Sequence, residues 1–381
     1  MGSGDSKQGH VQGNMFISLE INNIISGGIL RGSVHIALTE QLANPVLYLI
    51  FKGNEVTDFK IQHRSKNSTY YTRHVGKQLL CSLKAALYQW PDLVAYPGNF
   101  SFPFELKIYD NLLPSFHAYA HWGGFCQINY SIRAQLHATD RQPLKFKGPV
   151  YIYTNSITLP QEMYPQSISR DCPGHGSVLC CFNKEHATSR VSLERGTFGN
   201  LDYIDINLET NLSGFSANIT RVEIEVNKVL TMTANKKNSR ICTQVVNMLR
   251  TDQRPGIKAL SGAQRFNFRV PIPSILKSEH CYTMSAQLIK CFFVLNVKLH
   301  TEFYCCKCYG FDEANQGIVI LPFQIQAPMI PPPIAPEQWQ AQLLPQSSIN
   351  PNLQDSNNPN PLIVRSFTNQ PGLTDKVTPQ S

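Results

Sequence analysis

Apolar and polar residues alternate with a period of two along most of the chain. In residues 128–136 every second side chain, from Ile128 to Leu136, is apolar, and the side chains between them are polar. Because a strand directs successive side chains to opposite faces, this pattern predicts strands with one buried and one solvated face. Similar alternation occurs in residues 17–21, 34–38, 204–208, 222–226 and 293–299.

The segments between these runs are rich in Gly, Pro, Asn and Asp. Short strands separated by such turn residues are typical of antiparallel β-sandwiches. Helical periodicity is scarce, and Gln78–Gln89 is the one stretch with room for a turn or two of helix. We therefore expect an all-β protein.

Proline distribution divides the chain. Residues 159–176 contain Pro160, Pro165 and Pro173 with little periodicity, which predicts a linker. The last stretch, residues 328–381, holds 11 of the 25 prolines, five charged residues and no Tyr. Such a segment buries too little apolar surface to offset its ordering entropy, so we expect a disordered tail. The expected organisation is a flexible N-terminus at 1–13, a first domain at 14–158, the linker, a second domain at 177–327 and the tail.

Several motifs resemble arrestin-domain proteins. The first half contains Tyr96–Leu106 (YPGNFSFPFEL), Leu113–Phe116 (LPSF) and Ile128–Leu136 (INYSIRAQL), which together resemble an arrestin N-terminal lobe. The second half is similar to an arrestin C-terminal lobe at Val191–Phe198, Ile204–Leu208, Pro271–Ile275 and Ile318–Pro322. The resemblance covers about residues 14–327 and implies two antiparallel, immunoglobulin-like β-sandwich lobes, the arrestin fold.

The cysteine pair Cys180–Cys181 and the prolines between the lobes resemble alpha-arrestins. Alpha-arrestins commonly carry PPxY motifs that recruit ubiquitin ligases. Here the tail has Pro331-Pro-Pro-Ile334 without a tyrosine, so the resemblance does not extend to that route. It implies a non-enzymatic adaptor that binds the tails of membrane-protein cargo, with a ubiquitin ligase or coat proteins as further partners.

The net charge of +8 is concentrated in two stretches. Residues 52–84 hold seven Lys or Arg against two acids, and residues 236–269 hold eight against Asp252 alone. One interpretation is two solvated loop regions; the other is two basic patches for phosphorylated tails or anionic lipid. For the first stretch we hypothesise anion binding by Arg64, Lys66, Arg73 and Lys77. A nucleic-acid partner is not expected, because no helical recognition element accompanies the charge.

Candidate chemistry is sparse. No nucleophile elbow, phosphate-binding glycine loop or H-E-x-x-H helix occurs, and we expect no cofactor. The residues with ligand types at metal-like spacing are Cys172, His175, Cys180, Cys181 and His186. One interpretation is a zinc site. The other, which we prefer, is a proline-rich linker that leads into a buried cysteine pair, so no metal is expected.

Lipidation is the remaining signal. Met1-Gly2-Ser3-Gly4-Asp5-Ser6 fits the myristoylation pattern at Gly2, although the same residues also arise by chance or as a cloning leader. Cys305, Cys306 and Cys308 could be core thiols, metal ligands or palmitoylation sites. Alternation places Cys306 and Cys308 on the face opposite Cys305, so all three cannot be core thiols, and we prefer cysteines exposed in a loop. Without an apolar signal sequence or a membrane span, we expect a cytoplasmic protein, peripheral on the plasma membrane or endosomes.

Three functions remain open from the sequence. The first is an arrestin-like adaptor in membrane-protein trafficking and endocytosis. The second is a retromer-like or coat-like structural trafficking subunit. The third, of another class, is a zinc-binding protein or cryptic enzyme.

Overall fold

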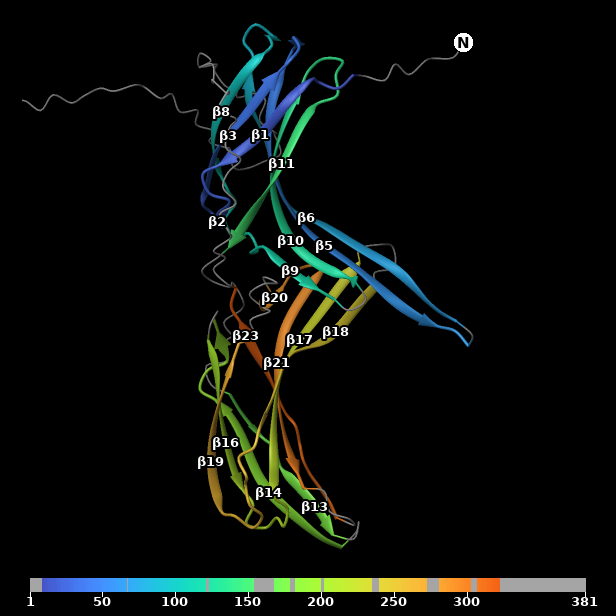
Figure 1. The fold of residues 1–381 in the computed structure, drawn as a ribbon, viewed down its shortest axis with the longest axis vertical. Helices are drawn as coiled ribbons and strands as arrows, with labels where there is room; N and C mark the ends of the chain where they lie inside the picture. Colours follow the sequence, from blue (N-terminus) through green and yellow to red (C-terminus); the bar gives the residue numbers. More distant parts are fainter. Residues whose placement is uncertain are drawn as a thin grey trace, which may run out of the picture.

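The described part of the protein is built of β-strands, as expected, and forms two lobes along one long axis (Figure 1). The computed structural model describes residues 9–66, 68–120, 123–153, 168–178, 182–199, 202–234, 240–272, 281–302 and 307–322. None of these segments forms an α-helix. Each lobe consists of two packed sheets, so the predicted pair of β-sandwiches is confirmed.

The first lobe packs a three-stranded sheet against a six-stranded sheet. The small sheet has the order β1 (Gly13–Leu19), β3 (Ile29–Leu38), β8 (Gly98–Lys107). The large sheet has the order β2 (Asn23–Ile25), β11 (Leu144–Tyr153), β10 (Phe125–His137), β5 (Val46–Arg64), β6 (Thr69–Gln89), with β9 (Phe116–Tyr119) also paired to β10. A short ribbon joins β4 (Leu42–Ala43) to β7 (Val94–Ala95). All pairs are antiparallel except β2 with β11.

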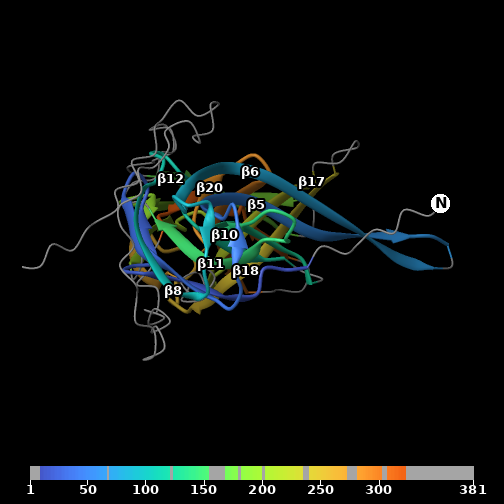
Figure 2. The same ribbon diagram turned by 90° about the horizontal axis from the view of Figure 1, so that it is seen from above.

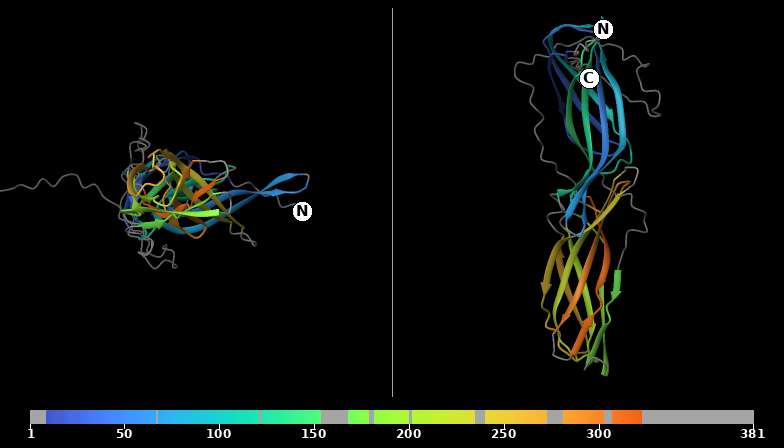
Figure 3. Two further views of the ribbon diagram at one scale, coloured as in Figure 1. Left: turned by 90° about the horizontal axis from the view of Figure 1, so that it is seen from below. Right: turned by 90° about the vertical axis from the view of Figure 1, so that its right-hand side faces the viewer.

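The second lobe has two six-stranded sheets. One has the order β19 (Ala263–Pro271), β16 (Tyr203–Asn211), β14 (Phe182–Leu193), β13 (Gly174–Val178), β22 (Lys307–Phe311), with β12 (Ile168–Asp171) paired to β14. The other has the order β15 (Thr197–Phe198), β23 (Ala314–Ile320), β21 (Ile289–Thr301), β17 (Ile219–Ala234), β18 (Arg240–Gln253), with β20 (Met284–Ser285) paired to β21. Figure 3 shows the two lobes end to end.

The alternation of the sequence accounts for the cores. Phe100, Phe102 and Phe104 of β8 all point inward and are at most 5% exposed. Pro103, between two of them, lacks a backbone N–H, and β8 accommodates it because it is an edge strand. Ile21 differs from the expectation, since β1 ends at Leu19 and Ile21 is exposed.

Three sequence expectations need correction. Gln78–Gln89, the one stretch in which the sequence left room for a turn or two of helix, belongs entirely to β6. The expected linker 159–176 is in its later part a piece of the second lobe, because β12 and β13 pair with β14. The expected flexible N-terminus is packed at Val11, which is buried and donates its N–H to the Gln142 carbonyl at 3.0 Å. Residues 1–8, the first part of the expected linker and the tail 328–381 lie outside the described residues.

The lobes contact each other through buried polar groups. Glu55 of β5 is fully buried, and its Oε1 accepts hydrogen bonds from the backbone N–H groups of Leu288 and Ile289, both at 2.7 Å. Its Oε2 is buried without a hydrogen-bond partner among the described residues. Burial raises the pKa of Glu55, and these backbone hydrogen bonds oppose the rise. Nearby, the Tyr282 hydroxyl donates to the Pro114 carbonyl at 2.9 Å.

A second contact lies where the long hairpin of β5 and β6 crosses the end of β17. The Thr57 hydroxyl donates to the Thr233 carbonyl at 2.7 Å. Gly76 of β6 lies beside it, and a Cβ at this position would be only 2.5 Å from the same carbonyl oxygen. Glycine therefore permits the close backbone approach of the lobes. Beyond this crossing the hairpin projects from the body (Figure 2).

Candidate functional site

The four cations predicted to bind anions lie on the projecting hairpin. Arg64, Lys66, Arg73 and Lys77 are all exposed. Residues 59–77, which form the outer half of the hairpin, contain five Lys or Arg and no acid. The hairpin is continuous from the pair Val46–Gln89 to the pair Arg64–Thr69, so its two long strands hold these charges away from the lobe.

The register places most of these cations on one face of the sheet. In β5 the even-numbered residues face outward, whereas odd-numbered residues such as Phe51 and Glu55 are buried. Directly opposed residues of neighbouring strands share a face. Lys60 is opposite Arg73, and Lys77 is opposite Val56. The hairpin cations therefore share the outer face of the large sheet, apart from Lys66, which lies in the turn.

Three further cations reach the same face from strands distant in sequence. Arg133 of β10 is opposite both Ile50 of β5 and Lys147 of β11. Lys145 lies one row away, opposite Gln135. None of these three was a sequence candidate. The alternation of each strand indicates that these three cations point outward. It does not indicate that β10 pairs with β5, so the sequence could not place them beside the hairpin cations.

We call this surface the cationic face. Its members are Lys52, Lys60, Arg64, Arg73, Lys77, Lys84, Arg133, Lys145 and Lys147. The four strands that carry it, β5, β6, β10 and β11, contain only two acids, and one of them, Glu55, is on the buried side.

Asp58, the acid on the outward side of these strands, offsets part of this charge through an ion pair with Arg73. Asp58 accepts hydrogen bonds from the Arg73 guanidinium, which lowers the pKa of the Asp58 carboxyl. At the other end, burial lowers the pKa of His137, and the charges of Lys84 and Lys145 lower it further. The Lys84 ammonium also lies over the Tyr48 ring, 4.3 Å from its centroid. A positive potential therefore extends from the hairpin onto the body of the sheet.

Exposed apolar side chains lie between these cations. Leu79, Val75 and Tyr71 of β6 are 48%, 37% and 46% exposed. They are opposite Asn54, Asp58 and Gln62, which are even-numbered residues of β5, so all three belong to the cationic face. The arrangement combines positive charge with apolar surface on one side of the sheet.

In the second predicted basic patch, residues 236–269, half of the described cations are paired with acids. Arg250, Arg265 and Arg269 pair with Glu223, Glu209 and Asp205 at 2.6, 2.9 and 2.7 Å. The acids come from neighbouring strands β16 and β17, which the linear count of charge in this stretch did not include.

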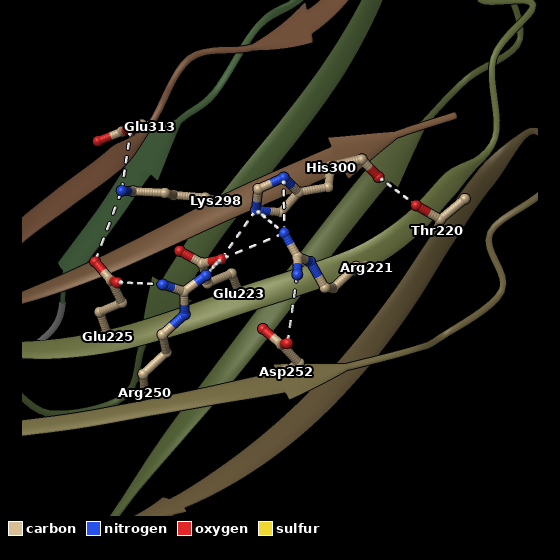
Figure 4. A network of polar contacts seen from close by, with 9 residues as sticks. All are labelled: Thr220, Arg221, Glu223, Glu225, Arg250, Asp252, Lys298, His300 and Glu313. Atoms are coloured by element: carbon tan, nitrogen blue, oxygen red, sulfur yellow. Dashed lines mark hydrogen bonds and ion pairs between the residues drawn. The ribbon is translucent and has the colours of Figure 1, made fainter. Parts of the chain in front are cut away.

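Around Glu223 these pairs extend into a network on the outer face of β17, β18 and β21 (Figure 4). Glu223 is 4% exposed and lies within 3.5 Å of Arg221, 2.6 Å of Arg250 and 3.3 Å of His300. The network is completed by Glu225, Asp252, Lys298, Glu313 and Thr220. Four carboxylates face three permanent cations and a histidine, so the charges are satisfied internally.

Among the described metal-ligand candidates, two histidines lie together, and Cys172 does not join them in a group that could hold a metal ion. Cys172 is buried, with its thiol directed at the Arg170 carbonyl 3.8 Å away, whereas His175 is exposed. The His175 ring packs edge-on against His186 with 5.8 Å between centroids. Cys180 and Cys181 lie outside the described residues. Within the described ranges no group of three or more His, Cys, Asp or Glu could hold a metal ion.

The lipidation candidates are only partly described. Gly2, Cys305 and Cys306 lie outside the described residues. Cys308 lies in β22, where its backbone is opposite Ser177, rather than in the expected loop. No helix in the described part of the chain could span a membrane.

Comparison with known proteins is consistent with this geometry. No curated protein matches the chain. Residues 25–153 match the family model described as "Arrestin (or S-antigen), N-terminal domain". The match covers about a third of the chain and nearly all of the first lobe, including the hairpin and the cationic face. The match and the all-β fold of packed sheets together assign an arrestin N-terminal domain to residues 25–153 of this chain.

Proposed function

We propose that this protein is a non-enzymatic, arrestin-like adaptor that links membrane-protein cargo to sorting machinery in trafficking and endocytosis. The observation that carries the proposal is the cationic face, which lies within the arrestin N-terminal domain and extends along a projecting hairpin. Exposed cations that outnumber the acids on a surface attract acidic or phosphorylated segments and anionic lipid. Cargo tails and the anionic membrane surface are the corresponding partners.

The body of the molecule suits an adaptor. The two lobes are joined by hydrogen bonds that the Glu55 carboxylate accepts and that the Thr57 and Tyr282 hydroxyls donate, and these bonds fix the direction of the hairpin relative to the second lobe. A rigid body with distant surfaces can hold two partners at once. A ubiquitin ligase or coat protein is the second partner in this proposal. Its working domain limits are 14–158 for the first lobe and, because β12 and β13 pair with β14, 168–327 for the second.

The alpha-arrestin subtype and a peripheral location on the plasma membrane or endosomes are part of the same proposal. Myristoylation at Gly2 would supply a weak anchor, because one myristoyl chain gives only marginal membrane affinity. The second signal would come from the cationic face or from acylation of Cys305, Cys306 or Cys308.

The decisive experiment is affinity purification of the full chain from detergent-solubilised membranes, followed by mass spectrometry. We expect integral membrane proteins to be recovered with the wild type. With Arg64→Glu/Lys66→Glu at the hairpin turn, recovery should fall sharply at low salt. Recovery of coat subunits without any membrane cargo would contradict the adaptor and favour a structural coat role.

The anchor has its own test. We expect Gly2→Ala to move the protein from the membrane fraction to the cytosol, because the variant lacks the site of acylation. Intact-mass measurement of the protein from its native cell checks the first step. An unmodified or merely acetylated N-terminus contradicts the lipid anchor.

A further inference from the structure

The cationic face spreads in two dimensions. Neighbouring strands lie about 4.8 Å apart, so Lys147 on β11 and Lys84 on β6, three strands away, bracket about 14 Å of sheet. Arg133 lies between them in the same row. Along the strands the face continues to Arg64 and the hairpin turn. The charges therefore form a broad array rather than a line.

The same face exposes apolar groups among its charges. Leu79, Val75 and Tyr71 are spaced along β6 between Lys84 and the hairpin turn. Exposed apolar side chains that share a surface with cations are costly in water and suit a membrane interface, where tyrosine is favoured and apolar groups leave the solvent.

We propose that the cationic face docks flat against the surface of an anionic lipid bilayer. Its cations meet the lipid headgroups, and the apolar side chains of β6 reach the interface between headgroups and acyl chains. The inference deepens the proposed function and rests on it for the setting, since an adaptor for membrane cargo works at a membrane.

The geometry favours a bilayer over an acidic or phosphorylated peptide. An added peptide strand needs a free sheet edge. β6 is one edge of this sheet, and β11 is paired on its outer side with β2 only over Tyr151–Tyr153. A strand added at β6 would lie beside the cations of β6, and one added at β11 beside Lys145 and Lys147, so neither would reach both groups. A lipid surface needs no free edge and can meet the cations of several strands together.

The orientation of the face also fits. Thr57 and Gly76, on the opposite side of the hairpin, contact the end of β17 in the second lobe. The cationic face therefore points away from the second lobe, which leaves it open to a flat partner.

The test is flotation of the full, unmodified chain with vesicles of phosphatidylcholine, with or without phosphatidylserine. We expect binding only with phosphatidylserine, and weaker binding as salt is raised. Arg133→Gln/Lys147→Gln should reduce the affinity about thirtyfold, because each cation near an anionic membrane contributes about fivefold. The control Lys258→Gln/Lys290→Gln removes the same charge from exposed positions of the second lobe and should leave binding unchanged.

A second variant separates the apolar contribution. Leu79→Ser/Val75→Ser should weaken vesicle binding while leaving binding to a soluble phosphoserine peptide unchanged. Circular dichroism and thermal unfolding of each variant check that it is folded. Equal binding to vesicles with and without phosphatidylserine would overturn the proposal. So would an equal loss of vesicle affinity in Arg133→Gln/Lys147→Gln and in the control Lys258→Gln/Lys290→Gln. Tight binding of the phosphopeptide through Arg133 and Lys147 without vesicle binding would assign the face to peptides instead.

The membrane proposal and the adaptor function can fail separately. If Arg133→Gln/Lys147→Gln abolishes vesicle binding but still captures the same membrane proteins from detergent extract, both stand, with docking and cargo capture on different surfaces. If the wild type binds vesicles and captures no membrane protein, the docking face stands and the adaptor function fails.

Discussion

Both lobes present the outer face of a large, mainly antiparallel sheet. Both faces are rich in charged residues, but the charges are arranged differently. On the first lobe nine Lys and Arg side chains share their face with one acid, Asp58. On the second lobe Arg221, Arg250 and Lys298 are surrounded by four carboxylates in one network (Figure 4). Both faces therefore carry many charged side chains, but only on the second lobe do the cations and carboxylates balance one another.

The difference separates two uses of the same residue types. Charges that satisfy one another across strands stabilise a sheet and leave little field outside it. Cations that outnumber the acids around them create a potential that an external anion can use. Linear charge counts place a basic stretch in each lobe, and only the cross-strand neighbours distinguish an open surface from a closed network.

The largest expected effect comes from the contact that fixes the two faces relative to each other. Glu55→Ala leaves the buried N–H groups of Leu288 and Ile289 without their acceptor, which should cost about 3 kcal/mol of unfolding free energy. Denaturant titration measures the loss, and small-angle scattering should show that the lobes separate. An unchanged scattering profile with full stability would contradict this role of Glu55.

Glu55→Gln tests the same contact through the pH dependence of stability. The raised pKa of Glu55 in the folded protein means that its protonated form is favoured there relative to the unfolded chain. Stability should therefore rise as the pH falls through the folded pKa towards the ordinary value for Glu. Glutamine retains an acceptor and does not titrate, so the variant should lose this slope. A slope of equal size in both proteins would assign it to another group.

Glu223→Ala is expected to break the network of the second lobe. The carboxylate is almost fully buried among three partners, but Arg250 and Arg221 can turn to solvent, so the cost should be about 2 kcal/mol. Thermal unfolding measures it. Binding to anionic vesicles should remain as in the wild type, because the network is not on the cationic face; a large loss of binding would contradict the comparison.

Asp58→Asn should make the face of the first lobe more positive and so strengthen its binding to anions. The variant removes the one acid of the cationic face and frees the charge of Arg73, so affinity for anionic vesicles should rise about fivefold at low salt. The stabilisation by Asp58 exists above its ordinary pKa and is lost as the pH falls through its lowered folded pKa. The variant should lack that acid-dependent loss. Weaker vesicle binding would show that the ion pair positions Arg73 for its partner.

The smallest effect is expected at an exposed ion pair of the second lobe. Arg265 is 82% exposed and pairs with Glu209, itself 43% exposed. Solvent screens such pairs, so Arg265→Ala should change the unfolding free energy by at most about 0.5 kcal/mol. A change comparable to that of Glu223→Ala, in the same thermal measurement, would show that exposure does not decide the value of these pairs.

The fold was predictable because its signals are local. Alternation over Ile128–Leu136 and the three inward Phe residues of β8 mark strands and faces without knowledge of their neighbours. Cys308 shows the limit, since a cluster of cysteines near a strand end suggested a loop and the backbone continues as β22. The candidate site was half predictable. Arg64, Lys66, Arg73 and Lys77 cluster in sequence, whereas Arg133, Lys145 and Lys147 join them only through the register of β10 with β5 and β11.

By itself the sequence determined the class of structure, the lobes' strand content and the positive charge of the β5–β6 hairpin, because these depend on side-chain period and composition over short spans. Only the tertiary structure decided which charges act together. Strand order brings Arg133 beside Ile50 and Glu223 beside Arg250, across 83 and 27 positions of the chain. Charge interactions depend on distance in space rather than in sequence, so the cations of the hairpin joined an open face, whereas Arg250 joined a closed network with acids of β17.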